Sequence, residues 1–354
     1  MTFRAAGLLG SAAALLIACV ADPQAPAVEP SGEPALVAAA TATPDVEGRL
    51  TLNAVGDLML ARDIVTLMDE HGSGYPFEAV RELLADADVM VANLEGTFTE
   101  RGEAVDKLYT FRTPPRHARG LAEAGIDLVA LGNNHTLDFG VEGLADTLAA
   151  LEAAGVRYSG AGANDAAARR PALLTASGLR LAFLSFSAVS ESTPAGEASP
   201  GVAWGDAAKI GADVTAAKRE ADLVIVSLHA GVEYQDAPSE TQRALARAAV
   251  DAGAVLVLGS HAHVFQGWER YRKAIIVYGL GNFVFDLDRD DLATLGERPF
   301  QTCVLRFELT RAGVESVSCR PVRIDPDENR PRPATGEEAA AIEARVERLN
   351  AALR

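Results

Sequence analysis

Short apolar segments that end in polar residues recur along this chain, and this repeat limits the folds open to it. The segment 126–131 is typical of a buried parallel strand, and Asn134 and His135 follow it within the sequence Gly-Asn-Asn-His. Four further apolar segments have the same form: 52–56 before Asp57, 89–92 before Asn93 and Glu95, 223–228 before His229, and 255–259 before His261 and His263. In open α/β sheets, ligands bind beyond the carboxyl ends of parallel strands. The repeat therefore predicts one site built from five strand ends.

The residue types at these strand ends are those that bind metal ions. Carboxylates, a side-chain amide and imidazoles all serve as ligands for divalent cations in proteins. We therefore predict a centre for one or two divalent cations such as manganese, zinc or iron. Of the six histidines in the chain, the four named above lie at strand ends. The other two, His71 and His117, lie in loop or amphipathic contexts that predict surface positions.

Amphipathic segments alternate with the apolar segments from residue 49 onward. They span residues 75–87, 115–124, 143–154 and 239–252. Alternating strands and helices predict an α/β fold with a parallel or mixed sheet that is covered on both faces. The segments 172–175 and 179–185 flank Ser177-Gly178, which indicates a hairpin within that sheet.

The overall charge argues against a nucleic-acid partner. The chain has 354 residues, with 32 basic and 49 acidic side chains and a net charge of −17. Binding to a phosphate backbone requires a basic face, so we predict no nucleic-acid partner. The hydrophobic content of 49% is enough for a large core.

The first 47 residues predict export. Arg4 precedes an apolar run at 5–17, which has the charged start and short hydrophobic core of a secretory signal. The run is shorter than the about 20 residues that cross a membrane. It ends in Leu-Ile-Ala before Cys19, which resembles a bacterial lipoprotein signal; an ordinary cleaved signal is the alternative. We predict a signal peptide at 1–18, a lipid anchor on Cys19, and an exported, membrane-anchored lipoprotein of the bacterial cell envelope.

A tether and a single folded domain are expected after this signal. Residues 19–47 are rich in Ala, Pro, Thr and Glu without periodicity, which predicts a disordered linker. Residues 48–325 form the predicted domain, and 326–354 a Pro-rich link with a terminal helix from about residue 337. Near the end of the domain, two strands at 302–309 and 314–322 carry Cys303 and Cys319 as diagonal neighbours on one face. This geometry permits a disulfide without requiring one.

Each strand-end residue also has an ordinary structural explanation. Asp57 is preceded by Gly56 and could form a turn or a helix cap, and Glu95 could be a solvated side chain beside an Asx-turn at Asn93. His135 could cap the following helix. His261 and His263 are the most specific pair, because alternate residues of an extended segment face the same way and can clamp one cation.

Seven blocks of the sequence resemble the CapA family, whose members are associated with poly-γ-glutamate capsule synthesis. They occur in the family's order and cover about residues 50–325: GDLML at 56–60, ANLE at 92–95, FRTP at 111–114, GNNHTLDFG at 132–140, HAGVEY at 229–234, GSHAHV at 259–264 and YGLGNF at 278–283. The resemblance implies association with an anionic polymer such as polyglutamate and with capsule synthesis or export proteins.

The CapA family in turn resembles the calcineurin-like metallophosphoesterases. Their fold implies a four-layer sandwich of two mixed β-sheets flanked by helices. The resemblance also implies metal ligands at Asp57, Glu95, Asn134, His229, His261 and His263. It makes His135 the proton donor and places Asp57 in the catalytic site. Met59 departs from the phosphoesterase pattern, which has a histidine ligand at that place, so one of two metal positions is predicted to be weak or empty.

Two further residues are candidates for binding the substrate. Arg112 could grip an anionic group through its planar guanidinium, and a structural salt bridge is the alternative. Asn282 is predicted to contact the substrate and, together with Glu233, to orient the metal ligands.

These observations favour a metal-dependent hydrolase that acts on an anionic polymer or a phosphoester. The rival hypothesis is a non-catalytic, polymer-binding component of a capsule synthesis or export complex. A phosphodiesterase unrelated to capsule is a third reading, and Met59 weakens it.

Overall fold

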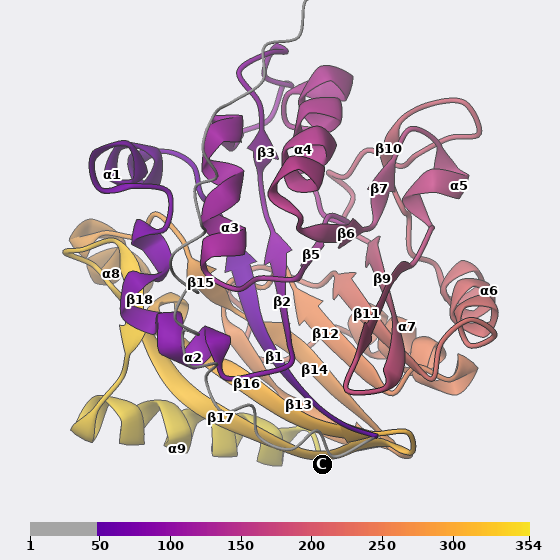
Figure 1. Ribbon diagram of the computed structural model, residues 1–354. Helices are drawn as coiled ribbons and strands as arrows, with labels where there is room; N and C mark the ends of the chain where they lie inside the picture. The colour runs from indigo at the N-terminus through magenta and orange to yellow at the C-terminus, as the bar shows by residue number, and fades with distance from the viewer. Residues whose placement is uncertain (1–47) are drawn as a thin grey trace, which may run out of the picture. The chain divides into compact units, whose positions relative to one another are not determined.

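The computed structural model describes residues 48–354 (Figure 1), and the features predicted for 1–18 and 19–47 lie outside them. The described residues contain two large mixed sheets and two small ones. Among residues 48–354, none of the helices has both the length and the apolar character needed to cross a membrane.

The first large sheet has eight strands in the order β18-β17-β16-β1-β2-β5-β6, with β15 beside β1. Its strands along the chain are β1 (Arg49–Leu58), β2 (Val89–Leu94), β5 (Leu128–Ala130), β6 (Arg157–Ser159), β15 (Asn282–Val284), β16 (Gln301–Thr310), β17 (Gly313–Asp325) and β18 (Arg330–Pro333). β1 pairs in parallel with β2 and β15 and antiparallel with β16, so the sheet is mixed.

The second large sheet has six strands in the order β13-β14-β12-β11-β9-β8. They are β8 (Ala172–Ala176), β9 (Leu179–Ser187), β11 (Leu223–His229), β12 (Leu256–Ser260), β13 (Phe265–Tyr271) and β14 (Ala274–Leu280). The predicted hairpin at Ser177-Gly178 joins β8 to β9. The two small sheets pair β3 (Thr97–Phe98) with β4 (Arg112–Thr113) and β7 (Ala161–Gly162) with β10 (Gly201–Val202).

The two large sheets pack face to face over an apolar core. Successive residues of a strand point to opposite faces, so Leu50 and Leu52 of β1 reach the same core as Leu181 and Phe183 of β9. The intervening residues, such as Leu184 of β9, face the helices on the outer side. Because both faces of β2 and β11 are buried, their sequences are almost continuously apolar, as expected for buried parallel strands.

Helices cover the outer face of each large sheet. The first sheet packs against α1 (Asp63–His71), η1 (Tyr75–Val80), α2 (Arg81–Ala85), η2 (Pro115–Ala118), α3 (Arg119–Glu123) and α4 (Gly140–Ala154). The second packs against α6 (Ala207–Ala217) and α7 (Glu240–Ala252) (Figure 1). The remaining helices are α5 (Asp165–Ala168), α8 (Arg289–Leu295), η3 (Arg298–Phe300) and α9 (Gly336–Ala352). The predicted four-layer sandwich is therefore confirmed.

The C-terminal segment contains the predicted terminal helix, as α9, and one strand that the sequence analysis did not predict. The Pro-rich link expected from residue 326 contains β18, which pairs with β17 as the edge strand of the first sheet. Helix α9 buries Ile342, Val346 and Leu349 against the core between the sheets. Residues 326–354 are thus part of the folded domain. The pattern was misread because prolines are tolerated in an edge strand, where the missing N–H faces outward.

Two further sequence predictions are resolved by the fold. Cys303 and Cys319 are bonded to each other, across strands β16 and β17. His117 is buried rather than at the surface, since its ring nitrogens contact Ser73 Oγ at 3.1 Å and Asp69 Oδ1 at 2.9 Å. A short helical element with two polar partners can bury an imidazole, and the sequence pattern did not show those partners.

The chain passes from the second sheet to the first at Gly281, between β14 and β15. There it lies directly against β1: Asp57 N–H donates to the Gly281 carbonyl at 2.9 Å, and Asp57 is the register partner of Asn282. A Cβ atom at Gly56 would lie 1.7 Å from that carbonyl oxygen. Glycine is therefore required at position 56 by contact with backbone atoms.

We expect Gly56→Ala to lower the free energy of unfolding by about 1–3 kcal/mol or more, because backbone must shift to admit the methyl group. Gly211→Ala is the matched control. In α6 the added Cβ would meet its nearest atom, on Ala252, at 3.9 Å, and alanine should stabilise the helix by about 0.5–1 kcal/mol. Urea unfolding of both variants measures the difference, and equal stabilities would contradict the steric requirement at Gly56.

We expect replacement of both Cys303 and Cys319 by alanine to destabilise the protein by about 3 kcal/mol, because the bond closes a loop with a sequence separation of 16. Thermal unfolding of oxidised protein, reduced protein and the double variant checks this. Reduction should lower the midpoint of the wild type and leave that of the double variant unchanged; an unchanged wild-type midpoint after complete reduction would refute it.

Candidate metal centre

The strand ends of both sheets deliver their polar side chains to one place. Asp57 lies near the end of β1 and Glu95 directly follows β2, while His229 ends β11. Ligand atoms of these three buried side chains lie within 4.8 Å of one another. A second group, formed by Glu233, His261 and His263, meets the same criterion. His263 joins the groups, because its Nε2 atom lies 3.7 Å from Glu95 Oε1 and 3.9 Å from Glu233 Oε1.

Three of these side chains hold a buried polar atom without a hydrogen-bond partner. The atoms are Asp57 Oδ2, Glu95 Oε1 and His261 Nδ1. Buried polar atoms are nearly always paired in folded proteins, so three such atoms in one cluster point to a missing ligand. Two anionic oxygens and an imidazole nitrogen suit a divalent cation. The residues present therefore fit the predicted metal.

The other oxygen of each carboxylate is held by Asn93. Its side-chain amide donates to Asp57 Oδ1 at 2.9 Å and to Glu95 Oε2 at 3.2 Å. The Asn93 oxygen in turn accepts from Asn133 Nδ2 at 3.1 Å. One amide thus fixes both carboxylates and leaves one oxygen of each free to face the cluster. The sequence interpretation noted Asn93 but did not assign it this role, which its spacing of two from Glu95 could have indicated.

Two imidazoles are oriented by neighbouring side chains. His263 Nδ1 lies 2.9 Å from Asn282 Oδ1, and because an amide oxygen only accepts, Nδ1 carries the proton and Nε2 presents its lone pair. His229 Nδ1 lies 2.8 Å from Ser260 Oγ, and its Nε2 lies 2.8 Å from Asn134 Oδ1. The predicted ligand Asn134 is thus at the cluster. Asn282 is buried and orients His263 rather than facing a cavity.

Burial sets the charge states of these groups. It raises the pKa of Asp57 and raises the pKa of Glu95 well above the usual range, and the neighbouring Asp57 carboxylate adds to the shift of Glu95. Burial likewise lowers the pKa of His229 and His263, and that of His261 to about 3. Neutral imidazoles are the form that binds metals, and a cation would offset the cost of burying two carboxylates.

His135 lies at the edge of the cluster in a fixed orientation. Its Nδ1 is 2.7 Å from Asp138 Oδ2, and its Nε2 is 3.8 Å from Glu95 Oε1. Lys107 Nζ donates to Asp138 Oδ1 at 2.9 Å and to the Asn134 carbonyl at 2.7 Å. The ring of Phe111 stacks on the imidazole with centroids 4.2 Å apart. The sequence predicted His135 but not Lys107, which lies 28 positions earlier on a segment without a recognisable motif.

Arg112 does not lie at the centre, and its predicted role in substrate binding is not supported by its contacts. Its guanidinium donates to the carbonyls of Arg101 and Gly102 at 3.1 and 2.6 Å and stacks 3.7 Å above the ring of Phe139. Arg112 therefore holds the loop at 101–102 in place. The sequence analysis gave a structural salt bridge as the alternative role of Arg112. The observed partners of Arg112 are carbonyl oxygens rather than a carboxylate.

The side chain of Met59 packs among apolar residues, in line with the absence of a histidine ligand at this position of the sequence. It is fully buried in an apolar cluster with Phe111 and Phe285. Its sulfur accepts the Ala61 N–H at 3.3 Å. The position that would carry a further nitrogen ligand therefore contributes none.

Two cavities meet at the centre. One, of about 820 Å³, is lined by Lys107, Asn134, Glu191 and His261 among others. The smaller, of about 330 Å³, is lined by Arg62, Phe111, His263 and Phe285 among others. Tyr109, His135 and Glu233 line both cavities. A substrate can therefore approach His135 from either side and His261 from the larger cavity.

Backbone strain also concentrates here. Seven non-glycine residues in the described part of the chain have positive φ, and four of them surround the centre: Arg62, Tyr234, His261 and His263. Such conformations are unfavourable for residues with a Cβ atom, and they collect at functional sites. The strain independently marks this region as the functional site.

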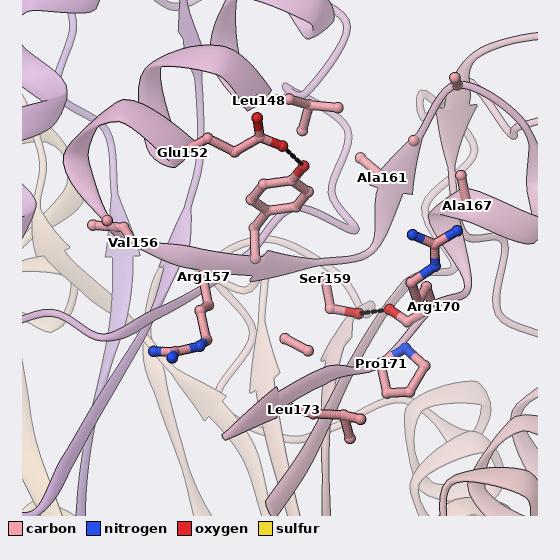
Figure 2. A pocket seen from close by; sticks show the side chains of 15 residues that line it. Leu148, Glu152, Val156, Arg157, Ser159, Ala161, Ala167, Arg170, Pro171 and Leu173 are labelled. Atoms are coloured by element: carbon pink, nitrogen blue, oxygen red, sulfur yellow. Dashed lines mark hydrogen bonds between the residues drawn. The ribbon is translucent and has the colours of Figure 1, made fainter. Parts of the chain in front are cut away.

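Another cavity, of about 660 Å³, lies between the edge strands β6 and β8 (Figure 2). Glu152 is the one carboxylate among its lining residues, and it accepts a hydrogen bond from Tyr158 Oη at 2.8 Å. No histidine lines this cavity. It offers no set of metal ligands, so we assign the functional site to the centre at the strand ends.

Comparisons with known proteins agree with the resemblance seen in the sequence. Residues 51–287 match the family model described as "Bacterial capsule synthesis protein PGA_cap". The chain is 31% identical over 296 residues to a capsule biosynthesis protein CapA of Bacillus anthracis, covering 81% of this chain and 70% of that protein. It is 31% identical over 283 residues to a PGA biosynthesis protein CapA of Bacillus subtilis, covering 78% and 74%.

Two solved structures are similar at a low level. A hypothetical protein from Thermus thermophilus has 21% identity and a TM-score of 0.47, with 77% of this chain and 98% of that chain covered. A 5'-nucleotidase precursor from the same organism has 14% identity and a TM-score of 0.47, with 86% and 59% covered.

We expect His261→Ala to abolish most metal binding and Asn93→Ala to weaken it about 10- to 100-fold, because Asn93 orients both carboxylates. Isothermal titration with Mn²⁺ and Zn²⁺, together with elemental analysis, measures affinity and stoichiometry. His71→Ala and Asn164→Ala are the controls: His71 is exposed, and Asn164 caps α5. Wild-type protein that binds neither ion would rule out the metal centre.

Proposed function

Because the chain belongs to the bacterial capsule synthesis protein family PGA_cap, we propose that it is a metal-dependent hydrolase of the bacterial cell envelope. Its substrate is an anionic polymer of the polyglutamate type or a phosphoester. One observation carries this proposal: unpaired oxygens of Asp57 and Glu95 and an unpaired nitrogen of His261 lie beside the His135–Asp138 pair. Metal ligands alone would serve binding, whereas an adjacent oriented imidazole serves proton transfer.

The proposed ligands of the metal are Asp57, Glu95, Asn134, His229, His261 and His263. A divalent cation such as manganese, zinc or iron would supply Lewis acidity there, polarising a phosphoryl or carbonyl oxygen of the substrate. Asn93 and Asn282 hold ligand side chains in orientation. The absence of a ligand at Met59 favours unequal occupancy if two cations bind.

His135 is the proposed proton donor. Asp138 accepts a hydrogen bond from the Nδ1–H group of His135. Nε2 is therefore the atom that exchanges a proton with the reacting group. Nε2 faces the side of Glu95 where the unpaired oxygen lies. The Asp138 carboxylate also stabilises the imidazolium form, and it is itself fixed by Lys107 and by the Phe111 N–H at 2.7 Å. After the donation, the proton resides on the leaving oxygen or nitrogen of the substrate.

The site of action is proposed to be outside the cytoplasm. The printed names of the Bacillus relatives refer to capsule and PGA biosynthesis, and we extend that association to this chain. The bond between Cys303 and Cys319 supports an oxidising compartment, because disulfides persist mainly in exported proteins. A lipid on Cys19 would hold the domain at the membrane, near capsule synthesis or export proteins.

A non-catalytic role in polymer binding is the second candidate. Met59 supports this candidate, because its apolar surroundings leave the centre without a metal ligand at that position. A binder would use the two cavities to hold an anionic chain and would need the cation only as a fixed charge. The two candidates differ in what they require of His135.

We expect His135→Ala to lower turnover by about 10²- to 10⁴-fold while leaving the metal stoichiometry unchanged, since His135 is not among the ligands. The assay uses Mn²⁺-loaded protein with γ-linked polyglutamate and with a panel of phosphomonoesters and phosphodiesters. His71→Ala should retain full activity. Metal-loaded wild type that binds polyglutamate but hydrolyses no substrate in the panel would establish the binding role instead.

A further inference from the structure

We propose that Arg62 binds the anionic group of the substrate, in the smaller of the two cavities at the metal centre. The inference rests on the proposed function for the nature of the substrate. The group it would hold is an oxyanion with two oxygens, either a carboxylate of a glutamate polymer or a phosphoryl group. This role replaces the one that the sequence suggested for Arg112.

Arg62 lies in the right place for such contact. It lines the cavity of about 330 Å³ together with His135, Glu233 and His263. The rest of the wall is mixed: Phe111, Phe285, Leu287 and Leu295 are apolar, whereas Asp286 and Asp291 are acidic. An anionic group in this cavity can therefore contact both the guanidinium of Arg62 and the imidazole of His263.

Two aromatic rings position the guanidinium. Its central carbon lies 5.2 Å from the ring centroid of Tyr109 and 5.1 Å from that of Phe111. Phe111 also stacks on His135. The same ring therefore contacts both the proposed proton donor and the proposed anion-binding residue. Stacking leaves the edge of the guanidinium, which carries its N–H donors, free for a bidentate contact.

No side-chain partner within residues 48–354 is recorded for Arg62, either as an ion pair within 4.0 Å or as a hydrogen bond. The other cations near the centre are committed: Lys107 to Asp138 and the Asn134 carbonyl, and Arg112 to two carbonyls. Asp286 and Asp291 line the same cavity as Arg62. Asp286 accepts a hydrogen bond from Asn329, and Asp291 belongs to the capping box of α8. Among the residues that line this cavity, Arg62 is therefore the cationic side chain whose N–H groups can donate to a bound anion.

The backbone at Arg62 supports a role for its side chain. Its φ of 57° and ψ of −130° belong to a region that glycine adopts readily and that is unfavourable for a residue with a Cβ atom. A glycine would relieve the strain and lose the guanidinium. Arginine at such a position indicates that the side chain serves a purpose other than stability.

The test measures binding of two probes to Mn²⁺-loaded protein by isothermal titration. The probes are a γ-linked glutamate oligomer and p-nitrophenyl phosphate, and a His135→Ala background prevents their consumption. We expect Arg62→Gln to weaken binding of the cognate probe by roughly 10- to 100-fold, as for loss of a hydrogen bond to a charged group. Loss confined to the glutamate oligomer identifies a carboxylate ligand, and loss confined to the ester identifies a phosphoryl ligand.

Arg272→Gln is the matched control. Arg272 also has positive φ, at 53°, and lies 5.6 Å from the ring of Tyr271, but it pairs with Asp251 and lines neither cavity of the centre. Its substitution should leave both affinities unchanged. Arg62→Gly should raise the thermal midpoint while weakening binding as Arg62→Gln does, which excludes misfolding as the cause.

Equal probe binding by the His135→Ala protein with and without Arg62→Gln would overturn the role of Arg62 and leave the hydrolase proposal standing. Binding that depends on Arg62, together with no turnover by Mn²⁺-loaded protein that retains His135, would keep the role of Arg62 and remove the hydrolase. Failure of both probes to bind the Mn²⁺-loaded protein would overturn the Arg62 proposal.

Discussion

The close approach of Gly56 and Gly281 joins the two large sheets at the point where the candidate metal centre forms. Asp57 donates its N–H to the Gly281 carbonyl and is the register partner of Asn282. Asn282 in turn holds His263, which belongs to the second sheet's set of ligands. The contact between two glycines therefore fixes a carboxylate from one sheet relative to an imidazole from the other. A side chain at Gly56 would push β1 away from Gly281 and so separate the two halves of the centre.

The centre buries two carboxylates, which are costly to remove from water, and hydrogen bonds satisfy only one oxygen of each. Asn93 satisfies one oxygen of Asp57 and one of Glu95, while the other oxygen of each has no partner. Burial of unpaired anionic atoms is unfavourable unless a cation compensates for it. The arrangement of these donor atoms therefore fits a divalent cation. The same reasoning explains why the imidazoles there remain neutral.

Much of the fold, and the convergence of polar side chains at the strand ends, could be predicted from the sequence because both depend on local patterns. Apolar runs between polar ends indicate buried parallel strands, and the carboxyl ends of such strands meet. Contacts between distant segments could not be predicted in this way. Lys107 reaches His135 from a loop without periodicity, β18 forms from a Pro-rich segment, and His117 is buried by partners more than 40 positions away. Each depends on tertiary packing that leaves no repeat in the sequence.

The two arginines Arg112 and Arg62 show why residue type alone does not assign a binding role. Arg112 lies in a motif typical of the family, yet its Nη2 donates to two backbone carbonyls and its guanidinium stacks on the Phe139 ring. Arg62 was not singled out by its motif, but it lines a cavity of the centre, with its guanidinium set by two rings and its backbone strained. A cation binds an external anion only if its donors are not already used within the protein. That condition depends on the folded geometry, and here it favours the arginine that the sequence passed over.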